Sequence, residues 1–298
     1  MEKLTACPVC RNAGFSPFLD AKDYFLTGED FSIVVCDHCG FKFTNPRPAK
    51  DEISRYYESE EYISHDTNKK SLTNTIYKLA RSYSLRRKYG LVKLWSKGVN
   101  ILDIGCGTGE FLKICNEKGM KVTGIEPNDK AAGFARSING IDVFPEQYLE
   151  NINSPVFDVI TMWHVLEHVH DLNQRMEKIT QILKPSGTLI IAVPNSSSFD
   201  ADHYKKFWAA YDLPRHLYHF SPESILSLAK NHHFSVREIL PMKMDAYYIS
   251  LLSEKYSKGK PGYLKAIKNG FSSNSYACTH QKRYSSQIFI LSKENAEN

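Results

Sequence analysis

The sequence contains no long hydrophobic run. None of its 298 residues lies in a stretch that approaches the ~18 consecutive apolar residues of a membrane-spanning helix. The first four residues, Met1-Glu-Lys-Leu4, also lack the apolar segment of a secretory leader. We therefore expect a cytoplasmic protein with no transmembrane segment. The composition, 42% hydrophobic and 24% charged, is ordinary for a folded chain long enough to bury a substantial core.

Acidic residues are missing from one part of the chain. The net charge is only +5, which permits a phosphate-bearing partner without requiring one, but no Asp or Glu stands between Asp66 and Asp103. Apolar residues at near-helical spacing predict a helix over 71–95 in this interval. Lysine and arginine side chains occupy the other face of this helix. This basic face is either the solvated side of a packed amphipathic helix or a surface for an acidic group, such as a nucleotide diphosphate or an anionic membrane.

Cysteine is scarce as well, but four of the seven cysteines form two pairs. The pairs are Cys7-Pro-Val-Cys10 and Cys36-Asp-His-Cys39. This spacing predicts a zinc ribbon, and since all four ligands are thiolates, the zinc should be structural. Two disulfides would be unusual in a reducing compartment, and a redox pair would need a βαβ setting.

The predicted ribbon is not basic. Residues 1–40 contain three basic residues against six acidic ones, whereas a ribbon that binds nucleic acid usually carries a dense basic patch. We therefore expect no stable nucleic-acid partner, and a docking or substrate-lid role for the ribbon. Asn45-Pro-Arg-Pro48 cannot be helical. It separates a ribbon domain, residues 1–48, from a helical connector or lid, residues 49–97.

The most informative stretch is Val99–Glu110, V-N-I-L-D-I-G-C-G-T-G-E. A short apolar run ends in three alternating glycines and is followed by a helical pattern, the layout of a nucleotide-binding crevice. Glycine has no Cβ, so the turn can adopt positive φ and lie against a ligand. A second strand, Val122–Glu126, ends in a carboxylate that can accept the two hydroxyls of a ribose. The alternative for Glu126 is an ordinary solvated strand end.

Strands and helices alternate through the next hundred residues. This alternation predicts a doubly wound, mostly parallel α/β sheet in a domain over residues 98–298. Two segments, 196–220 and 243–284, read as substrate-side insertions. The first is rich in aromatic and histidine side chains, which suits a pocket wall for a polar ring-shaped acceptor; the second is a candidate substrate cap.

Residues 102–110, L-D-I-G-C-G-T-G-E, resemble motif I of the class I S-adenosylmethionine-dependent methyltransferases. The resemblance covers roughly residues 99–240. It implies a Rossmann-like methyltransferase fold with a seven-stranded sheet and S-adenosylmethionine as cofactor. The cofactor-binding residues that it implies are Asp103, Gly105, Cys106, Gly107, Thr108, Gly109, Glu126, Pro127, Glu146, Gln147 and Trp163.

The N-terminal part resembles one branch of these enzymes. This part resembles the N-terminal part of methyltransferases of surface-glycan and secondary-metabolite pathways. The similarity lies in the four-cysteine ribbon, the Asn-Pro-Arg-Pro stretch and the tyrosines at 56, 57 and 62. In such relatives N-terminal tyrosines approach the cofactor, which makes Tyr62 a further cofactor-binding candidate. The stretch that begins at Asp212, D-L-P-R-H, resembles this branch too.

Histidines supply the candidate catalytic residues, His164, His168 and His216. His164, Glu167 and His168 share one face if their segment is helical. The first alternative is structural: His168 caps or pairs within the turn, and His164 packs on the cofactor. The second is that one histidine is a general base, because imidazole titrates near neutral pH. The third is that the group binds a divalent ion. Some methyltransferases bind an ion through Glu-x-x-Glu-His, and His164 departs from that pattern. His216 and its neighbour Arg215 have an alternative role in tying the following helix to the sheet.

The resemblance implies transfer of a methyl group from a sulfonium cofactor by in-line displacement, with Trp163 as a candidate cation–π partner of the sulfonium. We expect O-methylation of a sugar, nucleotide- or lipid-linked, so the main partner is a small saccharide acceptor. The alternatives are an N- or C-methyltransferase of a small metabolite, an RNA methyltransferase, and a non-catalytic docking module that binds the cofactor. If the protein docks on a membrane surface or on a protein complex, we expect the contact to be made by the basic helix or by the ribbon.

Overall fold

The computed structural model describes residues 1–58 and 72–294, with backbone only for 72–80. The chain divides into two compact units. The first unit contains residues 1–58, 164–175 and 191–290, and the second contains residues 59–163, 176–190 and 291–298. In the described part of the chain, no helix is both long and apolar enough to cross a membrane.

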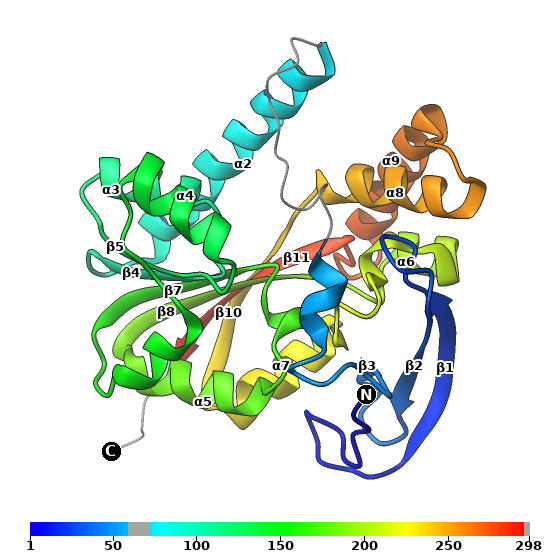
Figure 1. The fold of residues 1–298 in the computed structure, drawn as a ribbon, viewed down its shortest axis with the longest axis horizontal. Helices are drawn as coiled ribbons and strands as arrows, with labels where there is room; N and C mark the ends of the chain where they lie inside the picture. Colours follow the sequence, from blue (N-terminus) through cyan, green and yellow to red (C-terminus); the bar gives the residue numbers. More distant parts are fainter. Residues whose placement is uncertain (59–71, 295–298) are drawn as a thin grey trace. The chain divides into compact units, whose positions relative to one another are not determined.

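Seven strands of the described residues form one sheet, in the order β10-β11-β8-β7-β4-β5-β6 (Figure 1). β4 pairs in parallel with β5 and β7, and β5 with β6. The sheet confirms the predicted doubly wound, mostly parallel fold class. The strands are β4 (Asn100–Ile104), β5 (Lys121–Ile125), β6 (Val143–Phe144), β7 (Phe157–Trp163), β8 (Leu183–Pro194), β10 (Phe234–Pro241) and β11 (Ser286–Lys293).

Helices accompany these strands as the alternation predicts. α3 packs on β5 and α4 on β6, and the two helices lie beside β4 and β5 in Figure 1. α4 begins where Asn128 accepts a hydrogen bond from the Ala131 N–H, and it ends at left-handed Gly140. The helices are α2 (Leu72–Trp95), α3 (Glu110–Glu117), α4 (Asp129–Asn139), the 3₁₀ helix η2 (Glu146–Asn151) and α5 (Leu172–Ile182).

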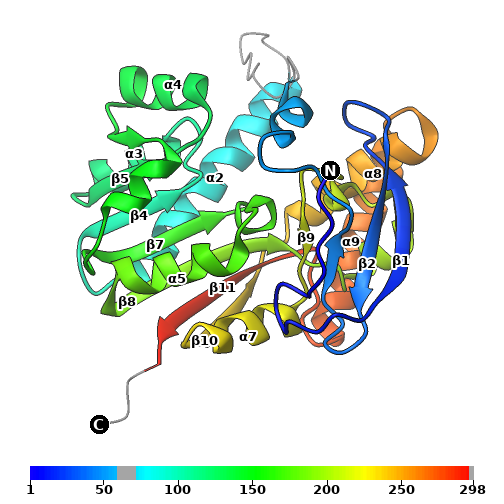
Figure 2. The same ribbon diagram turned by 60° about the horizontal axis from the view of Figure 1, so that its bottom comes forward.

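The first unit contains a smaller antiparallel sheet, in the order β1-β2-β3-β9. Figure 2 shows β1 (Phe15–Lys22) and β2 (Asp30–Cys36) side by side in blue. β3 (Lys42–Thr44) pairs with β9 (Tyr218–His219), which belongs to the segment 196–220. The predicted ribbon therefore shares a sheet with a strand far along the chain, a pairing that no sequence pattern indicates.

The segment 243–284 forms two helices, α8 (Asp245–Lys258) and α9 (Tyr263–Thr279), where the sequence indicates no defined element. They pack against each other and are orange in Figure 1. Gly270 permits their close approach, because a Cβ there would lie 2.6 Å from the Tyr247 ring. The other helices of this unit are η1 (Ile53–Tyr57), η3 (Leu166–His168), α6 (Phe199–Tyr204), η4 (Lys205–Phe207), η5 (Ala209–Tyr211) and α7 (Pro222–Asn231).

Candidate functional site

The three glycines after β4 have different structural roles. Gly105, Gly107 and Gly109 all adopt positive φ, at 72°, 54° and 76°. At Gly109 a Cβ would approach the Cβ of Ala135 to 2.9 Å, so this glycine lets the turn pack on α4. At Gly107 a Cβ would meet no atom within 4 Å. The turn is therefore packed at one end and open to a ligand in its middle.

Glu126, directly after β5, holds this turn. Its carboxylate accepts the Gly107 N–H at 2.8 Å and the Asn128 N–H at 2.9 Å. Burial raises the pKa of Glu126, and these two hydrogen bonds oppose that effect. A carboxylate has about four lone-pair positions, so Glu126 keeps capacity for the hydroxyls of a ligand. Its position fits the ribose-binding role that the resemblance implies.

Asp103 lies under the turn on β4. Its carboxylate is buried and accepts a 2.6 Å hydrogen bond from the Thr161 hydroxyl on β7. Burial raises the pKa of Asp103 to about 7, and both the Thr161 hydrogen bond and the charge of Lys88 oppose the rise. Asp103 is thus a carboxylate that changes charge near neutral pH.

A cation already lies over the Trp163 ring at the end of β7. The Lys88 ammonium, on α2, is 4.7 Å from the ring centroid. The Trp163 indole N–H is buried and has no hydrogen-bond partner among the described residues. An orphaned buried donor beside a cation-binding ring fits a polar ligand at this position.

The remaining predicted cofactor residues lie around the same strand ends. Cys106 contributes packing through its side chain, since a Cβ on Gly124 would lie 2.6 Å from the Cys106 sulfur. The Thr108 carbonyl accepts a 2.7 Å hydrogen bond from the Asn139 side chain, which ties the turn to α4. Pro127 follows Glu126, and Glu146 and Gln147 begin η2. Tyr62 lies outside the described residues.

His164 follows Trp163 in the chain and belongs to the first unit. Its backbone is left-handed, with φ of 59°. Its two ring nitrogens lie 3.2 Å from an Asp245 oxygen and 3.4 Å from a Glu167 oxygen. Burial favours the neutral ring, but the interactions with Asp245 and Glu167 outweigh it and raise the pKa of His164 to about 9. His164 is therefore protonated at neutral pH, which does not favour its predicted role as a base.

His168, on η3, is held in the neutral form. Burial and the neighbouring His216 lower its pKa to about 4. Its Nδ1 lies 3.0 Å from the Arg215 carbonyl oxygen and 2.9 Å from the Tyr57 hydroxyl. The His168 ring centroid is 4.6 Å from that of His216.

The structure therefore gathers all three predicted histidines of the first unit around Glu167. It adds Asp245, at the start of α8, which sequence reasoning missed because no motif singles out this residue within the segment 243–284, the candidate substrate cap. Tyr57 belongs to the tyrosine group noted in the sequence, but its contact with His168 depends on the fold.

Comparison with known proteins identifies the family. The methyltransferase-domain family matches residues 65–239, more than half of the chain. The chain belongs to this family. Together with the fold, this membership confirms the predicted class of S-adenosylmethionine-dependent methyltransferases.

Individual relatives of this methyltransferase are similar over part of their length. The mitochondrial ubiquinone biosynthesis O-methyltransferase of Rattus norvegicus is 34% identical over 110 residues, which cover 34% of this chain and 32% of that protein. The ubiquinone biosynthesis O-methyltransferase of Maricaulis maris is 31% identical over 134 residues, 42% of this chain and 52% of that protein. The alignments thus span about half or less of these relatives.

A solved structure supports the fold. The methyltransferase from Archaeoglobus fulgidus, described as SAM-dependent, superposes with a TM-score of 0.50 at 20% identity and covers 72% of this chain and 94% of its own. At this identity the likeness concerns the fold alone.

The four paired cysteines of the methyltransferase come together as the spacing predicts. Cys7 and Cys39 have their sulfurs 3.6 Å apart, and Cys10 and Cys36 have theirs 3.5 Å apart. Four thiolates around one zinc ion at 2.3 Å would be about 3.8 Å apart, so the donor set and its size fit zinc. Gly40 and Arg11, one residue past each pair, are both left-handed.

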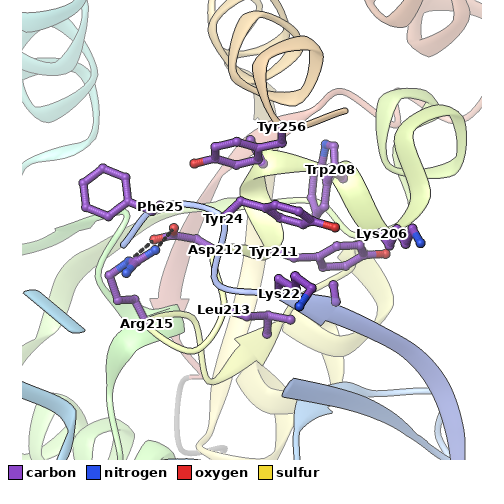
Figure 3. Close-up of a pocket in the computed structure, with 12 residues that line it drawn as sticks. Lys22, Tyr24, Phe25, Lys206, Trp208, Tyr211, Asp212, Leu213, Arg215 and Tyr256 are labelled. Carbon is purple, nitrogen blue, oxygen red and sulfur yellow. Dashed lines mark hydrogen bonds and ion pairs between the residues drawn. The ribbon is translucent and has the colours of Figure 1, made fainter. Parts of the chain in front are cut away.

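Arg215 has a structural role in the first unit. Its guanidinium donates to both Asp212 oxygens at 2.7 and 3.0 Å, to Asp23 at 3.0 Å and to the Tyr56 carbonyl at 2.9 Å. These carboxylates raise its pKa although burial opposes the charge. Figure 3 shows the small pocket beside this ion pair, lined by Tyr24 and other aromatic side chains. Because the charges of Arg215 and Asp212 are paired with each other, we do not place the acceptor in this pocket.

Most aromatic side chains of segment 196–220 belong to the core of the first unit. Trp208, Tyr211, Tyr218 and Phe220 are each less than 5% exposed. The Trp208 indole donates to Asp200 at 2.8 Å. The expected aromatic pocket wall is therefore largely a packed interior.

Proposed function

We propose that this methyltransferase transfers the methyl group of S-adenosylmethionine to a hydroxyl oxygen of a small polar acceptor. The observation that carries the cofactor assignment is the glycine turn, in which Gly107 faces open space and Glu126 binds its N–H. The choice of oxygen is supported by the two relatives, both named O-methyltransferases.

The residues of the second unit have distinct roles in holding the cofactor. The turn and Asp103 bind its methionine part, Glu126 binds the ribose hydroxyls, and Glu146 and Gln147 lie near the adenine. The sulfonium loses its positive charge as the methyl carbon passes to the acceptor oxygen. Because no new anion forms on the cofactor, we assign most of the acceleration to positioning, with the reacting atoms about 3–3.5 Å apart and in line.

We propose that the cluster around Glu167 serves the acceptor. The acceptor hydroxyl loses a proton during transfer, and His168 and His216 keep an imidazole nitrogen that no described backbone group engages. Replacing His164, His168 or His216 with Gln tests this role. We expect lower kcat with unchanged cofactor affinity, and near-normal turnover in all three variants would contradict it.

The acceptor that we propose first is a sugar hydroxyl, on the resemblance of the N-terminal part to glycan-modifying enzymes. A quinone precursor is the second candidate, favoured by the names of the two relatives. Mass spectrometry and NMR of the product, after incubation with panels of nucleotide sugars and quinone precursors, distinguish these acceptors. The same spectra separate O-methyl from N- or C-methyl products.

We also propose that the four cysteines bind a structural zinc ion. All four ligands come from the protein, so no position is left for a substrate, and the ion would stabilise the fold of the ribbon.

The decisive experiment is calorimetric titration of the zinc-loaded protein with S-adenosylmethionine and with its demethylated product. We expect one site for each at micromolar affinity. A folded, zinc-loaded protein that binds neither would contradict the proposed function and favour a docking module. Steeply salt-dependent RNA binding would instead favour the RNA methyltransferase alternative.

A further inference from the structure

We propose that the outer face of α9 binds the surface of a membrane that contains anionic lipids. Four large apolar side chains share this face and are exposed there: Tyr263, Leu264, Ile267 and Phe271. They stand at positions i, i+1, i+4 and i+8 of one helix, which places them side by side on its surface. Leu264 is 86% exposed, and the other three are 59–64% exposed. Isolated exposed apolar side chains are ordinary, whereas a contiguous group marks an interaction surface.

The packing of α9 determines which face points outward. Its buried residues are small and lie on another side of the helix: Ala266, Gly270, Ser273 and Ala277. Gly270 lies against α8, which runs beside α9 in Figure 1. The Ser273 hydroxyl donates to Asp200 of α6 at 2.8 Å. A rotation of α9 that buried Phe271 would break both contacts, so the large apolar side chains are held at the surface.

Lysines border the apolar face. Lys268 lies one turn from both Leu264 and Phe271, and Lys265 precedes it by one turn. Both lysines are exposed, and they have no acidic partner in the part of the chain that the structure describes. The sequence from Lys255 to Lys293 contains no Asp or Glu. The face is therefore apolar with a cationic border, the pattern of helices that lie in a membrane interface.

The charge favours a lipid surface over a second copy of the chain. A two-fold dimer through this face would set the same patch of each copy against the other. Lys265 and Lys268 would then approach their counterparts with no acidic residue of the face to compensate them, and like charges across an interface are unfavourable. The headgroups of anionic lipids supply negative charge, so the apolar centre and the cationic border are satisfied together.

The residue types on this face suit the depth at which a surface helix lies. Leucine, isoleucine and phenylalanine side chains enter the boundary between headgroups and acyl chains, about 5–10 Å deep. The hydroxyl of Tyr263 stays at the level of the headgroups. Lysine stems lie along apolar surface and keep their ammonium groups among the headgroups. We therefore expect α9 to lie flat on the membrane while its buried residues stay packed on α8 and α6.

This inference goes beyond the proposed function, because vesicle binding is measured without cofactor or acceptor. It also concerns a different element from the basic helix over 71–95 and from the ribbon, the two candidates for docking that the sequence offers. Failure of vesicle binding would leave the assignment of methyl transfer in place, and failure of methyl transfer would leave the membrane surface in place.

The test is co-sedimentation of the full chain with vesicles made of equal parts of phosphatidylglycerol and phosphatidylcholine. Each basic residue near an anionic surface strengthens binding by about fivefold, so binding to vesicles of phosphatidylcholine alone should be at least about tenfold weaker. Amide hydrogen exchange over residues 263–272 should slow when the anionic vesicles are added. Absence of binding, equal binding to both kinds of vesicle, or protection confined to other elements would overturn the proposal.

Matched variants locate the surface. Ile267→Gln should weaken binding to the anionic vesicles by about tenfold, whereas Ile138→Gln, at a 63% exposed position on α4, should leave it unchanged. Lys268→Glu should weaken binding by about twentyfold, whereas Lys230→Glu, at an exposed position on α7, should have a much smaller effect. Equal losses within either pair contradict the assignment.

The remaining occupant, a second copy of the chain, is examined by sedimentation equilibrium without vesicles. We expect Ile267→Gln to leave the oligomeric state unchanged. A wild-type dimer that this variant dissociates would mean that a second copy covers the face, and it would overturn the proposal. All four substituted positions are exposed, so an unchanged circular dichroism spectrum is expected. The wild-type sedimentation and exchange measurements decide the question even if a variant misfolds.

Discussion

The Thr161 hydroxyl donates a 2.6 Å hydrogen bond to the buried carboxylate of Asp103, across neighbouring strands of the parallel sheet. This hydrogen bond and the charge of Lys88 do not offset the cost of burying the carboxylate, so the pKa of Asp103 rises to about 7. The residue that we expect to bind the methionine part of the cofactor therefore titrates near neutral pH.

The first prediction concerns pH. The folded state binds the Asp103 proton more tightly than the unfolded chain, where an aspartate pKa is about 3.9. The contribution of Asp103 to stability therefore falls as pH rises from about 4 to about 7 and is constant above. Urea unfolding over this pH range measures the free energy of unfolding of the wild type and of Asp103→Asn. The wild-type value minus the variant value should fall as pH rises. A pH-independent difference would contradict the raised pKa.

Cofactor affinity should have the opposite dependence on pH. An ionised Asp103 attracts the cationic cofactor, so wild-type affinity for S-adenosylmethionine should rise through about pH 7. The Asp103→Asn variant should bind more weakly and without this rise. Calorimetry at pH 6, 7 and 8 is the measurement, with those values chosen to bracket the pKa of about 7.

The second prediction separates backbone strain from ligand contact. Gly107 and Gly119 both have positive φ and no atom within 4 Å of a built Cβ. Alanine at either position should cost about 1–2 kcal/mol of stability, because a Cβ disfavours the left-handed region. Only Gly107→Ala should weaken cofactor binding, by at least tenfold, since its Cβ would enter the space that we assign to the ligand. Equal affinities in the two variants would argue against that assignment.

The third prediction concerns the ribbon. Cys7→Ser should abolish stoichiometric zinc and lower the melting temperature by more than about 10 °C, because a structural zinc site supplies folding free energy directly. Cys278→Ser is the control, since Cys278 is exposed and outside the cluster. Zinc content and thermal unfolding are measured together. A Cys7→Ser protein with wild-type zinc and stability would exclude the four-cysteine site.

The fourth prediction compares two arginines. Arg215→Lys keeps the positive charge but loses the bidentate pairing with Asp212 inside the first unit, and it should destabilise the protein by about 1.5–3 kcal/mol, the contribution of a hydrogen bond to a charged group. Arg283→Lys alters a surface pair with Glu223, whose side chains are 37% and 59% exposed, and should cost less than about 1 kcal/mol. Denaturant unfolding distinguishes them. Similar losses would mean that the buried pair adds nothing beyond a surface contact.

Features that depend on short stretches of sequence could be predicted. The glycine turn after β4 and the paired cysteines carry their geometry in local spacing, and the structure contains both. The alternation of strands and helices likewise predicted the parallel sheet. For each of these features, the spacing of a few residue types along the chain is enough to predict the local structure.

Features that depend on long-range pairing could not be predicted. His216 meets Glu167 because the Leu217 N–H bonds to the Glu167 carbonyl, and no spacing encodes this contact. The aromatic side chains around Trp208 have the composition of a pocket wall, but β1, β2 and α8 pack on them as a core. Composition indicates which side chains gather and does not indicate whether solvent or protein covers them.

The pairing of β3 with β9 has a consequence for anyone who shortens this chain. The sequence predicts residues 1–48 as a separate ribbon domain. In the structure, however, Phe41 of this domain stacks on Tyr218 and packs on Phe220. Removing this domain would leave the backbone groups of β9 without their partner strand and uncover these rings. An unpaired strand edge beside exposed aromatic surface is a template for aggregation, so a truncated catalytic domain should be recovered as insoluble protein.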